Sequence, residues 1–238
     1  SDALPRLVSI KAGTKLNVVP GKAKATVEGM ESRVLEETAK TVEAETGIHY
    51  LFEYEAPFTT ITAVGAGAHA SRPEDGNNAL TGLLTLLVRL PFAPCAQMDY
   101  VKKAIDLIPH GDVNGKTLGV EMEDEISGKL TLAFDMLTVD AAGLDAEFDT
   151  RVPVCGNEDN VLKVVRENLT AKGFTVLTDS MIAPHYVPGD SEFIKTLLRV
   201  YEAYTGLKGE CQSTGGGTYV HHIENGVAFG AALPGTDN

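Results

Sequence analysis

The sequence of 238 residues contains no tryptophan, only 3 cysteines and few aromatic side chains. It also lacks an apolar run of the roughly 18 residues that cross a membrane. The longest candidate, residues 80–92, is interrupted by Arg89, and it predicts an amphipathic or buried helix. The cysteines are far apart and form no C-x-x-C pair, which favours reduced thiols and a cytoplasmic location. No amino-terminal signal peptide is expected.

Basic residues are also scarce: 20 Lys and Arg face 33 Asp and Glu, for a net charge of -13. Phosphate backbones require clustered Lys and Arg, and the sequence shows no such cluster. This argues against nucleic acid and anionic membrane surfaces as partners. An apolar content of 43% is typical of a folded globular chain.

The spacing of apolar residues predicts an α+β fold. Strands are expected at residues 7–10, 15–19, 23–27, 50–54, 59–64, 129–137, 138–141, 145–152 and 174–178. Helices are expected at residues 31–45, 77–90, 99–108, 158–172 and 192–204, with Asn77 as the N-cap of the second. Each half repeats a hairpin, a helix and a strand, which predicts a two-lobed layer of antiparallel sheets covered by helices. The segment after a linker at 184–189 is too short to form its own core.

Residues 65–73 join a strand of small residues to a helix through His69. Glycine and alanine let a ligand or another backbone come close. The turn places the imidazole at the end of regular structure, where side chains often meet substrate. The alternative is a partly buried histidine satisfied by a loop carbonyl.

Three other stretches carry candidate binding groups. Asn17 stands near a strand end, where its carboxamide could hold a carbonyl or carboxylate, or simply form a turn. Arg151 ends a strand and could bind a carboxylate with two hydrogen bonds, or pair with an acid such as Asp149. The loop of Gly215, Gly216, Gly217 and Thr218 could hold an anion with its N–H groups, or be a flexible hairpin tip.

No complete metal site is evident in the sequence. It contains no H-E-x-x-H and no cysteine cluster. His221 and His222 are adjacent, and on a strand they would point to opposite faces.

Taken together, these stretches resemble the M20 family of metal-dependent dipeptidases, especially its monomeric PepV-like branch. The resemblance extends from about residue 7 to residue 238. It rests on the order and spacing of residues 17–20, 67–79, 151–153, 215–219, 226–230 and 234–235. In that family the catalytic domain binds two zinc ions and carries an inserted lid, and the substrate is a dipeptide with a free carboxyl end.

The resemblance also implies a division of the chain and a role for each candidate residue. Residues 7–92 and 93–188 would be the two lobes of the lid, and residues 189–238 would be an incomplete part of the catalytic domain. His69 would stabilise the tetrahedral intermediate, and Asn17 would lie near the substrate. The carboxyl end of the dipeptide would be held by Arg151, Gly215, Gly216, Gly217 and Thr218.

One large departure separates this chain from the family pattern. The family's metal ligands and general-base glutamate lie in a segment before the lid and shortly after a Pro-Gly pair like that at 234–235. We therefore expect an excised or truncated part of a zinc dipeptidase, inactive and without bound zinc until joined by the missing catalytic segment. The alternatives are a non-catalytic binding or dimerisation module of the same family, and an amidohydrolase acting on N-acyl amino acids.

Overall fold

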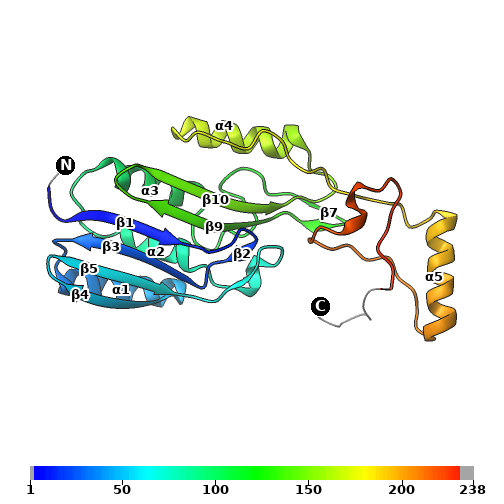
Figure 1. Cartoon of the computed structure of the whole chain (residues 1–238), viewed down its shortest axis with the longest axis horizontal. Helices are drawn as coiled ribbons and strands as arrows, with labels where there is room; N and C mark the ends of the chain where they lie inside the picture. Colours follow the sequence, from blue (N-terminus) through cyan, green and yellow to red (C-terminus); the bar gives the residue numbers. More distant parts are fainter. Residues whose placement is uncertain (1–2, 231–238) are drawn as a thin grey trace.

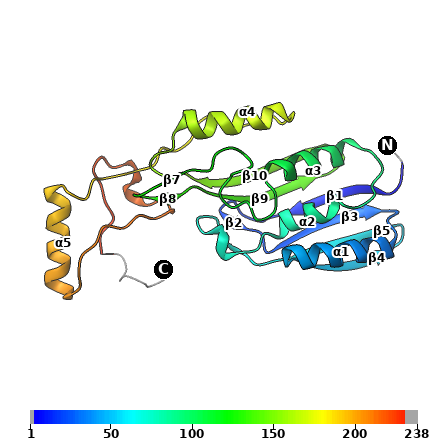
Figure 2. The same cartoon turned by 180° about the vertical axis from the view of Figure 1, so that it is seen from behind.

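The computed structural model describes residues 3–230, and a six-stranded antiparallel sheet forms its centre. The strand order is β10-β9-β1-β3-β5-β4. The strands are β1 (Arg6–Ala12), β3 (Lys22–Glu28), β4 (His49–Glu55), β5 (Phe58–Val64), β9 (Thr131–Val139) and β10 (Leu144–Arg151). Helices α1 (Ser32–Thr46), α2 (Ala79–Leu87) and α3 (Ala96–Leu107) lie on one face of this sheet (Figures 1 and 2).

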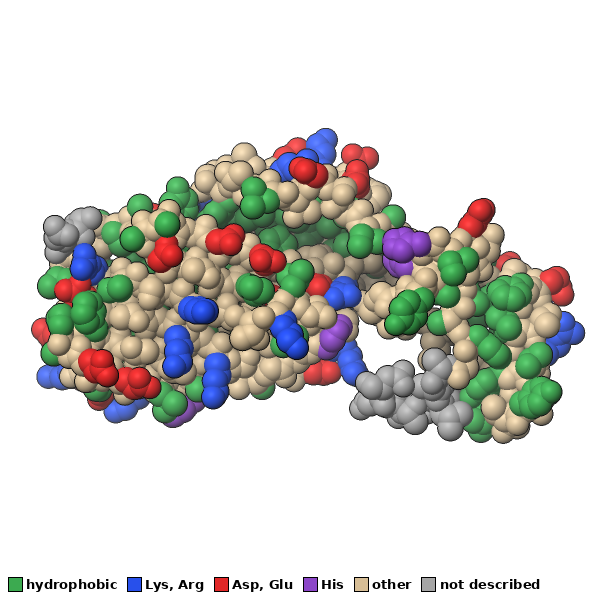
Figure 3. Space-filling view, viewed as in Figure 1, with side chains coloured by type: hydrophobic (Ala, Val, Ile, Leu, Met, Phe, Trp, Pro, Cys, Tyr) green, Lys and Arg blue, Asp and Glu red, His purple; other side chains and the backbone are tan. Residues whose placement is uncertain are grey.

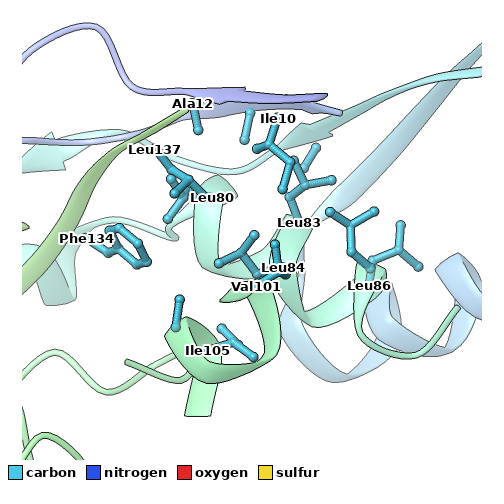
Figure 4. Close-up of a cluster of buried hydrophobic side chains, with 14 of the residues drawn as sticks. Ile10, Ala12, Leu80, Leu83, Leu84, Leu86, Val101, Ile105, Phe134 and Leu137 are labelled. Carbon is cyan, nitrogen blue, oxygen red and sulfur yellow. The ribbon is translucent and has the colours of Figure 1, made fainter. Parts of the chain in front are cut away.

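The core lies between the sheet and helix α2, whose sequence is apolar on nearly every side. Eight of the 9 residues of α2 are buried. Leucines of α2 meet side chains of β1, β9 and α3 (Figure 4). The side chain of Asn78 caps α2 by accepting from the N–H groups of Leu80 and Thr81, and it donates to the carbonyl of Phe134 at 2.9 Å. This cap therefore fixes the start of α2 against strand β9.

The structure confirms the expected α+β class with antiparallel sheets and corrects several elements. The N-cap of α2 is Asn78, because Asn77 instead donates to the Thr46 carbonyl and pairs with Ala66. The two strands expected at 129–141 are mainly one strand, β9. Residues 174–178 form no strand and pair with no other strand of the described chain; the ring of Phe174 packs against Tyr100 of α3.

The sheet joins segments from both halves of the chain. Strand β1 pairs with β9 through the partners Ile10↔Val139, Lys11↔Thr138 and Ala12↔Leu137. One sheet therefore crosses the expected lobe boundary between residues 92 and 93, so the two halves share a hydrogen-bonded ladder.

Shorter elements lie around the sheet. They are β2 (Val18–Val19), β6 (Ala68–His69), η1 (Pro73–Asp75), β7 (Glu123–Asp124), β8 (Gly128–Lys129), η2 (Glu158–Leu162), α4 (Lys163–Ala171), α5 (Glu192–Thr205) and η3 (Tyr219–His222). Helix α5 extends away from the sheet (Figure 1), and Ile194 is its one buried residue. Within residues 3–230, no helix combines the length and apolar character required to cross a membrane.

The packing of α2 on Ile48 provides a test of the core. A Cβ added at Gly82 would lie 2.4 Å from Cγ1 of Ile48. We expect Gly82→Ala to lower the free energy of unfolding by about 1–3 kcal/mol, because overpacking forces neighbouring side chains to shift. Urea denaturation should also show that Gly82→Ala costs less in an Ile48→Ala background, where the space is free. Equal costs in both backgrounds would contradict this packing.

Candidate functional site

His69 ends one strand of a small two-stranded ladder, and Asn17 directly precedes the other. Strands β2 and β6 pair antiparallel, with Val18 opposite His69. The N–H of Ala70 donates to the carbonyl of Asn17 at 3.0 Å. Both Asn17 and His69 are exposed, so their side chains are accessible from solvent. Two residues expected to act on the same substrate are therefore held by one small ladder.

The neighbouring Ser71 determines which nitrogen of His69 carries a proton. The N–H of Ser71 donates to Nδ1 of His69 at 3.1 Å, and Oγ of Ser71 lies 2.7 Å from the same nitrogen. A nitrogen that accepts from a backbone N–H cannot itself be protonated. The neutral ring therefore carries its proton on Nε2, which can act as a hydrogen-bond donor.

Arg151 forms the ion pair with Asp149 that the sequence offered as one alternative, and it also contacts the glycine loop. Its Nε and Nη2 donate to the two carboxylate oxygens of Asp149 at 2.6 Å and 2.7 Å, as the salt-bridge alternative predicted. Its Nη1 also donates to the carbonyl of Gly215 at 3.0 Å. This last bond joins residues 64 positions apart and brings the glycine loop to the end of β10.

Gly215 connects Arg151 with the histidine turn. A Cβ built on Gly215 would lie 3.0 Å from Cβ of Ser71, so the glycine backbone lies close against the residue that orients His69. On the other side, Thr131 stands opposite Arg151 in the sheet and donates to the carbonyl of Ala70 at 3.3 Å. The structure thus brings together His69, Asn17, Arg151 and Gly215.

The other loop residues, Gly216, Gly217 and Thr218, make fewer contacts with the rest of the chain than Gly215. The N–H of Gly216 donates to Oγ1 of Thr214 at 3.2 Å, and a Cβ at Gly217 would meet nothing within 4 Å. Thr218 is the N-cap residue of η3. These residues have space for a ligand, but no described contact ties them to Arg151. The pair Pro234-Gly235, part of the family resemblance, lies outside the described residues.

The four converging residues form an open surface. A small cavity of about 60 Å³ lies between the turn at Pro73–Asn78 and the loop around His110, but none of the four lines it. Its size suits water, which fills polar cavities of this kind. Any substrate held at His69 and Arg151 would therefore need a second surface to enclose it.

Sequence reasoning missed Asp135, which lies within this group. Its side chain is fully buried on β9, where Oδ2 accepts the N–H of Asn17 at 3.0 Å and Oδ1 has no hydrogen-bond partner within residues 3–230. Burial raises the pKa of Asp135 to about 7, and the charge of Asp149 contributes in the same direction. An acid within the apolar run of residues 130–139 was the available signal.

The histidines near the end of the described chain form a cluster that differs from the sequence expectation. His221 and His222 lie in η3 and not on a strand, so their rings are neighbours, with centroids 5.5 Å apart. His185 lies 5.6 Å from His221, and Nε2 of each ring contacts a backbone carbonyl. Nevertheless, in residues 3–230 no three His, Cys, Asp or Glu side chains are arranged to hold a metal ion.

The raised pKa of Asp135 predicts a pH-dependent stability. Between its ordinary value of 3.8 and about 7, the folded chain retains a proton that the unfolded chain releases. The stability contributed by this proton is complete below about pH 4 and is lost as the pH rises through about 7. We therefore expect the stability of Asp135→Asn relative to wild type to increase between about pH 5 and about pH 8. Urea denaturation at both pH values measures this; Asp145→Asn, an exposed change on β10, should show no such increase.

Similarity to named proteins adds to the geometry of the site. No family model matches the chain. It is 32% identical over 226 residues to a Beta-Ala-Xaa dipeptidase of Lactobacillus delbrueckii subsp. lactis, an alignment that covers 94% of this chain and 47% of that protein. It is 32% identical over 231 residues to YtjP of Bacillus subtilis (strain 168), whose name assigns it provisionally as a dipeptidase; 96% of this chain and 49% of YtjP are covered.

A third relative, SH1171 of Staphylococcus haemolyticus (strain JCSC1435), has the same provisional dipeptidase name. It is 24% identical over 243 residues, which cover 98% of this chain and 50% of that protein. The chain thus spans about half the length of the curated relatives it matches. Nearly all of this chain is therefore similar to a part of proteins named as dipeptidases.

Proposed function

We propose that this chain is the lid and part of the returning catalytic segment of a zinc-dependent dipeptidase of the M20 type. In this proposal it binds the carboxyl end of a dipeptide and supplies His69 to the tetrahedral intermediate. The observation that carries the proposal is the convergence of His69, Asn17, Arg151 and Gly215, which come from four distant parts of the sequence. The named relatives support dipeptides as the substrate class.

The chemistry of the oxyanion step follows from the state of His69. Acyl transfer to water places negative charge on the former carbonyl oxygen, and a fixed N–H donor stabilises that charge more than it stabilises the substrate. Nε2 of His69 is such a donor because Ser71 occupies Nδ1. Arg151 and the exposed N–H groups of the glycine loop suit the carboxylate of the substrate.

The described residues do not fit a zinc centre, because no group of three potential ligands lies together within residues 3–230. We therefore assign no metal-dependent step to this chain. In the proposal both zinc ions and the general base belong to the remaining half of a complete protein, in line with the length of the relatives. This chain alone would then bind substrate weakly and hydrolyse none.

The exposed apolar side chains of helix α5 support a further segment that packs against this helix in the complete protein. Phe193 and Val200 are 55% and 41% exposed, and Tyr204 is 88% exposed. Apolar side chains gather over this part of the molecule (Figure 3), where the helix has few contacts with the sheet. Exposed apolar groups of this extent mark a contact surface. We propose that the catalytic segment covers this helix and closes the open site around His69.

The proposal is tested by comparing this chain with the complete protein. Only the complete protein should hydrolyse dipeptides with a free carboxyl end, and blocking that carboxyl should reduce kcat/KM. A complete protein that cleaves N-acyl amino acids instead would favour an amidohydrolase. One that binds dipeptides without cleaving them would favour a binding module.

His69 can be tested in the complete protein by two substitutions. His69→Ala removes the Nε2 donor, and we expect kcat to fall by roughly 100-fold or more, because loss of one oxyanion donor costs about 2.7–4 kcal/mol in the transition state. His69→Gln retains an N–H donor at similar reach and should lose less. Steady-state kinetics measures both, with circular dichroism to check folding. If kcat is unchanged in His69→Ala, His69 does not have this role.

The role of Arg151 is separable from its pairing with Asp149. We expect Arg151→Ala to raise KM for dipeptides with a free carboxyl end by about tenfold or more, because charge-assisted bonds contribute about 1.5–3 kcal/mol each. Carboxyl-blocked dipeptides should show little change. The double variant Asp149→Asn with Arg151→Ala leaves no unpaired carboxylate. If it restores KM, the effect came from Asp149 and the assignment to substrate is wrong.

A further inference from the structure

The chain leaves the main sheet after β1 and crosses over strand β9 before it reaches β2. Gly13 starts this crossing with a φ of 79°, and an added Cβ would lie 1.9 Å from the carbonyl oxygen of Asp135. Asn17 ends it with a φ of 71°, in the left-handed region that asparagine adopts more readily than most residues other than glycine.

Two hydrogen bonds hold the Asn17 backbone, and only one of them comes from a side chain. The Asn17 N–H donates to Oδ2 of the buried Asp135 at 3.0 Å. The Asn17 carbonyl accepts the N–H of Ala70, next to His69. Asp135 is therefore bonded directly to Asn17 and is connected through Asn17 to Ala70, the neighbour of His69.

Stability does not account for an aspartate at this position. The side chain is fully buried, and its Oδ1 has no hydrogen-bond partner among the described residues. A buried carboxylate with an unsatisfied oxygen destabilises a fold, and an apolar residue of similar size would be the more stable choice. Val19, Ala70 and Ala133 form a small apolar cluster at the ladder, and Ala133 lies two residues before Asp135 on the same face of β9.

We propose that Asp135 is a positioning residue, whose carboxyl group holds the Asn17 turn and thereby the β2–β6 ladder that carries His69. The proposal rests on the proposed function only in so far as Asn17 and His69 act on the substrate. The hydrogen bond to Asn17 is strongest when the carboxyl is ionised, since charge-assisted bonds are stronger than neutral ones.

The charges around Asp135 make its ionisation responsive to the site. On β10, Asp149 and Glu147 oppose the ionised form and Arg151 favours it. Two further charged residues lie on segments near β9: Lys15 between β1 and β2, and Asp75 of η1. Both side chains are exposed to solvent, which screens their effect on Asp135. Arg151 therefore acts on both Asp149 and Asp135, and a ligand that draws Arg151 away would weaken ionisation at Asp135.

The first test uses this 238-residue chain and does not depend on activity. The amide signal of Asn17 in ¹H–¹⁵N spectra should titrate with a midpoint well above the ordinary range of an aspartate. Asp135→Asn keeps an acceptor of the same shape but cannot ionise, so this titration should disappear. Asp145→Asn, the exposed control on β10, should leave it unchanged. An Asn17 titration that persists in Asp135→Asn would overturn the proposal.

The second test uses the complete protein and separates positioning from folding. Asp135→Ala should lower kcat by about tenfold or more with KM little changed, because a small displacement of a catalytic group has effects up to roughly 100-fold. Asp135→Asn should have a kcat close to that of wild type. The pH dependence of its kcat should lack the component that arises from ionisation of Asp135. If Asp135→Ala folds and retains full kcat, Asp135 does not position the site. If wild type has no activity, the proposed function fails and the Asn17 titration alone decides this inference.

Discussion

The site depends on a crossing of the chain over its own sheet between β1 and β3. Glycine is required at residue 13 because β9 passes too close for a side chain, and Asn17 takes a left-handed backbone conformation at the other end. Once the chain has crossed, Val18 and Val19 pair with His69 and Ala68. The position of the histidine therefore follows from how the crossing is held, and Asp135 is the side chain beneath it.

A rigid support and an open site place opposite demands on this chain. The face of the sheet under α2 is closed and apolar, which supplies the stability that a rigid support needs. The opposite end, where His69 and Asn17 lie, is exposed and contains a buried carboxyl with one unsatisfied oxygen. Stability is thus supplied by α2 and its neighbours, which allows strained or unsatisfied groups at the site.

The sequence predicted most elements with strong periodicity. It also singled out His69, Asn17, Arg151 and Gly215, which lie near one another in the structure, while their roles stay predictions. The helix at 31–45 and the strand pair at 50–64 appear with small changes of boundary, since their apolar faces are regular. Asn78 could not be distinguished from Asn77 as a cap, because the choice depends on the distant carbonyl of Phe134. The strand expected at 174–178 has no ladder partner, and Asp135 was missed because its partner is a main-chain N–H across 118 positions.

The electrostatics of Arg151 constrain how a carboxylate can bind. Its charge is already balanced by Asp149, and further acids lie nearby, so net positive charge cannot be the main attraction. The described bonds use three of its N–H groups, which leaves two of the five that a guanidinium offers. A carboxylate would be recognised mainly through those donors and the exposed N–H groups beside Gly215. Such recognition depends on geometry, and the glycine loop must therefore be held in place, as the bond from Arg151 to Gly215 already does.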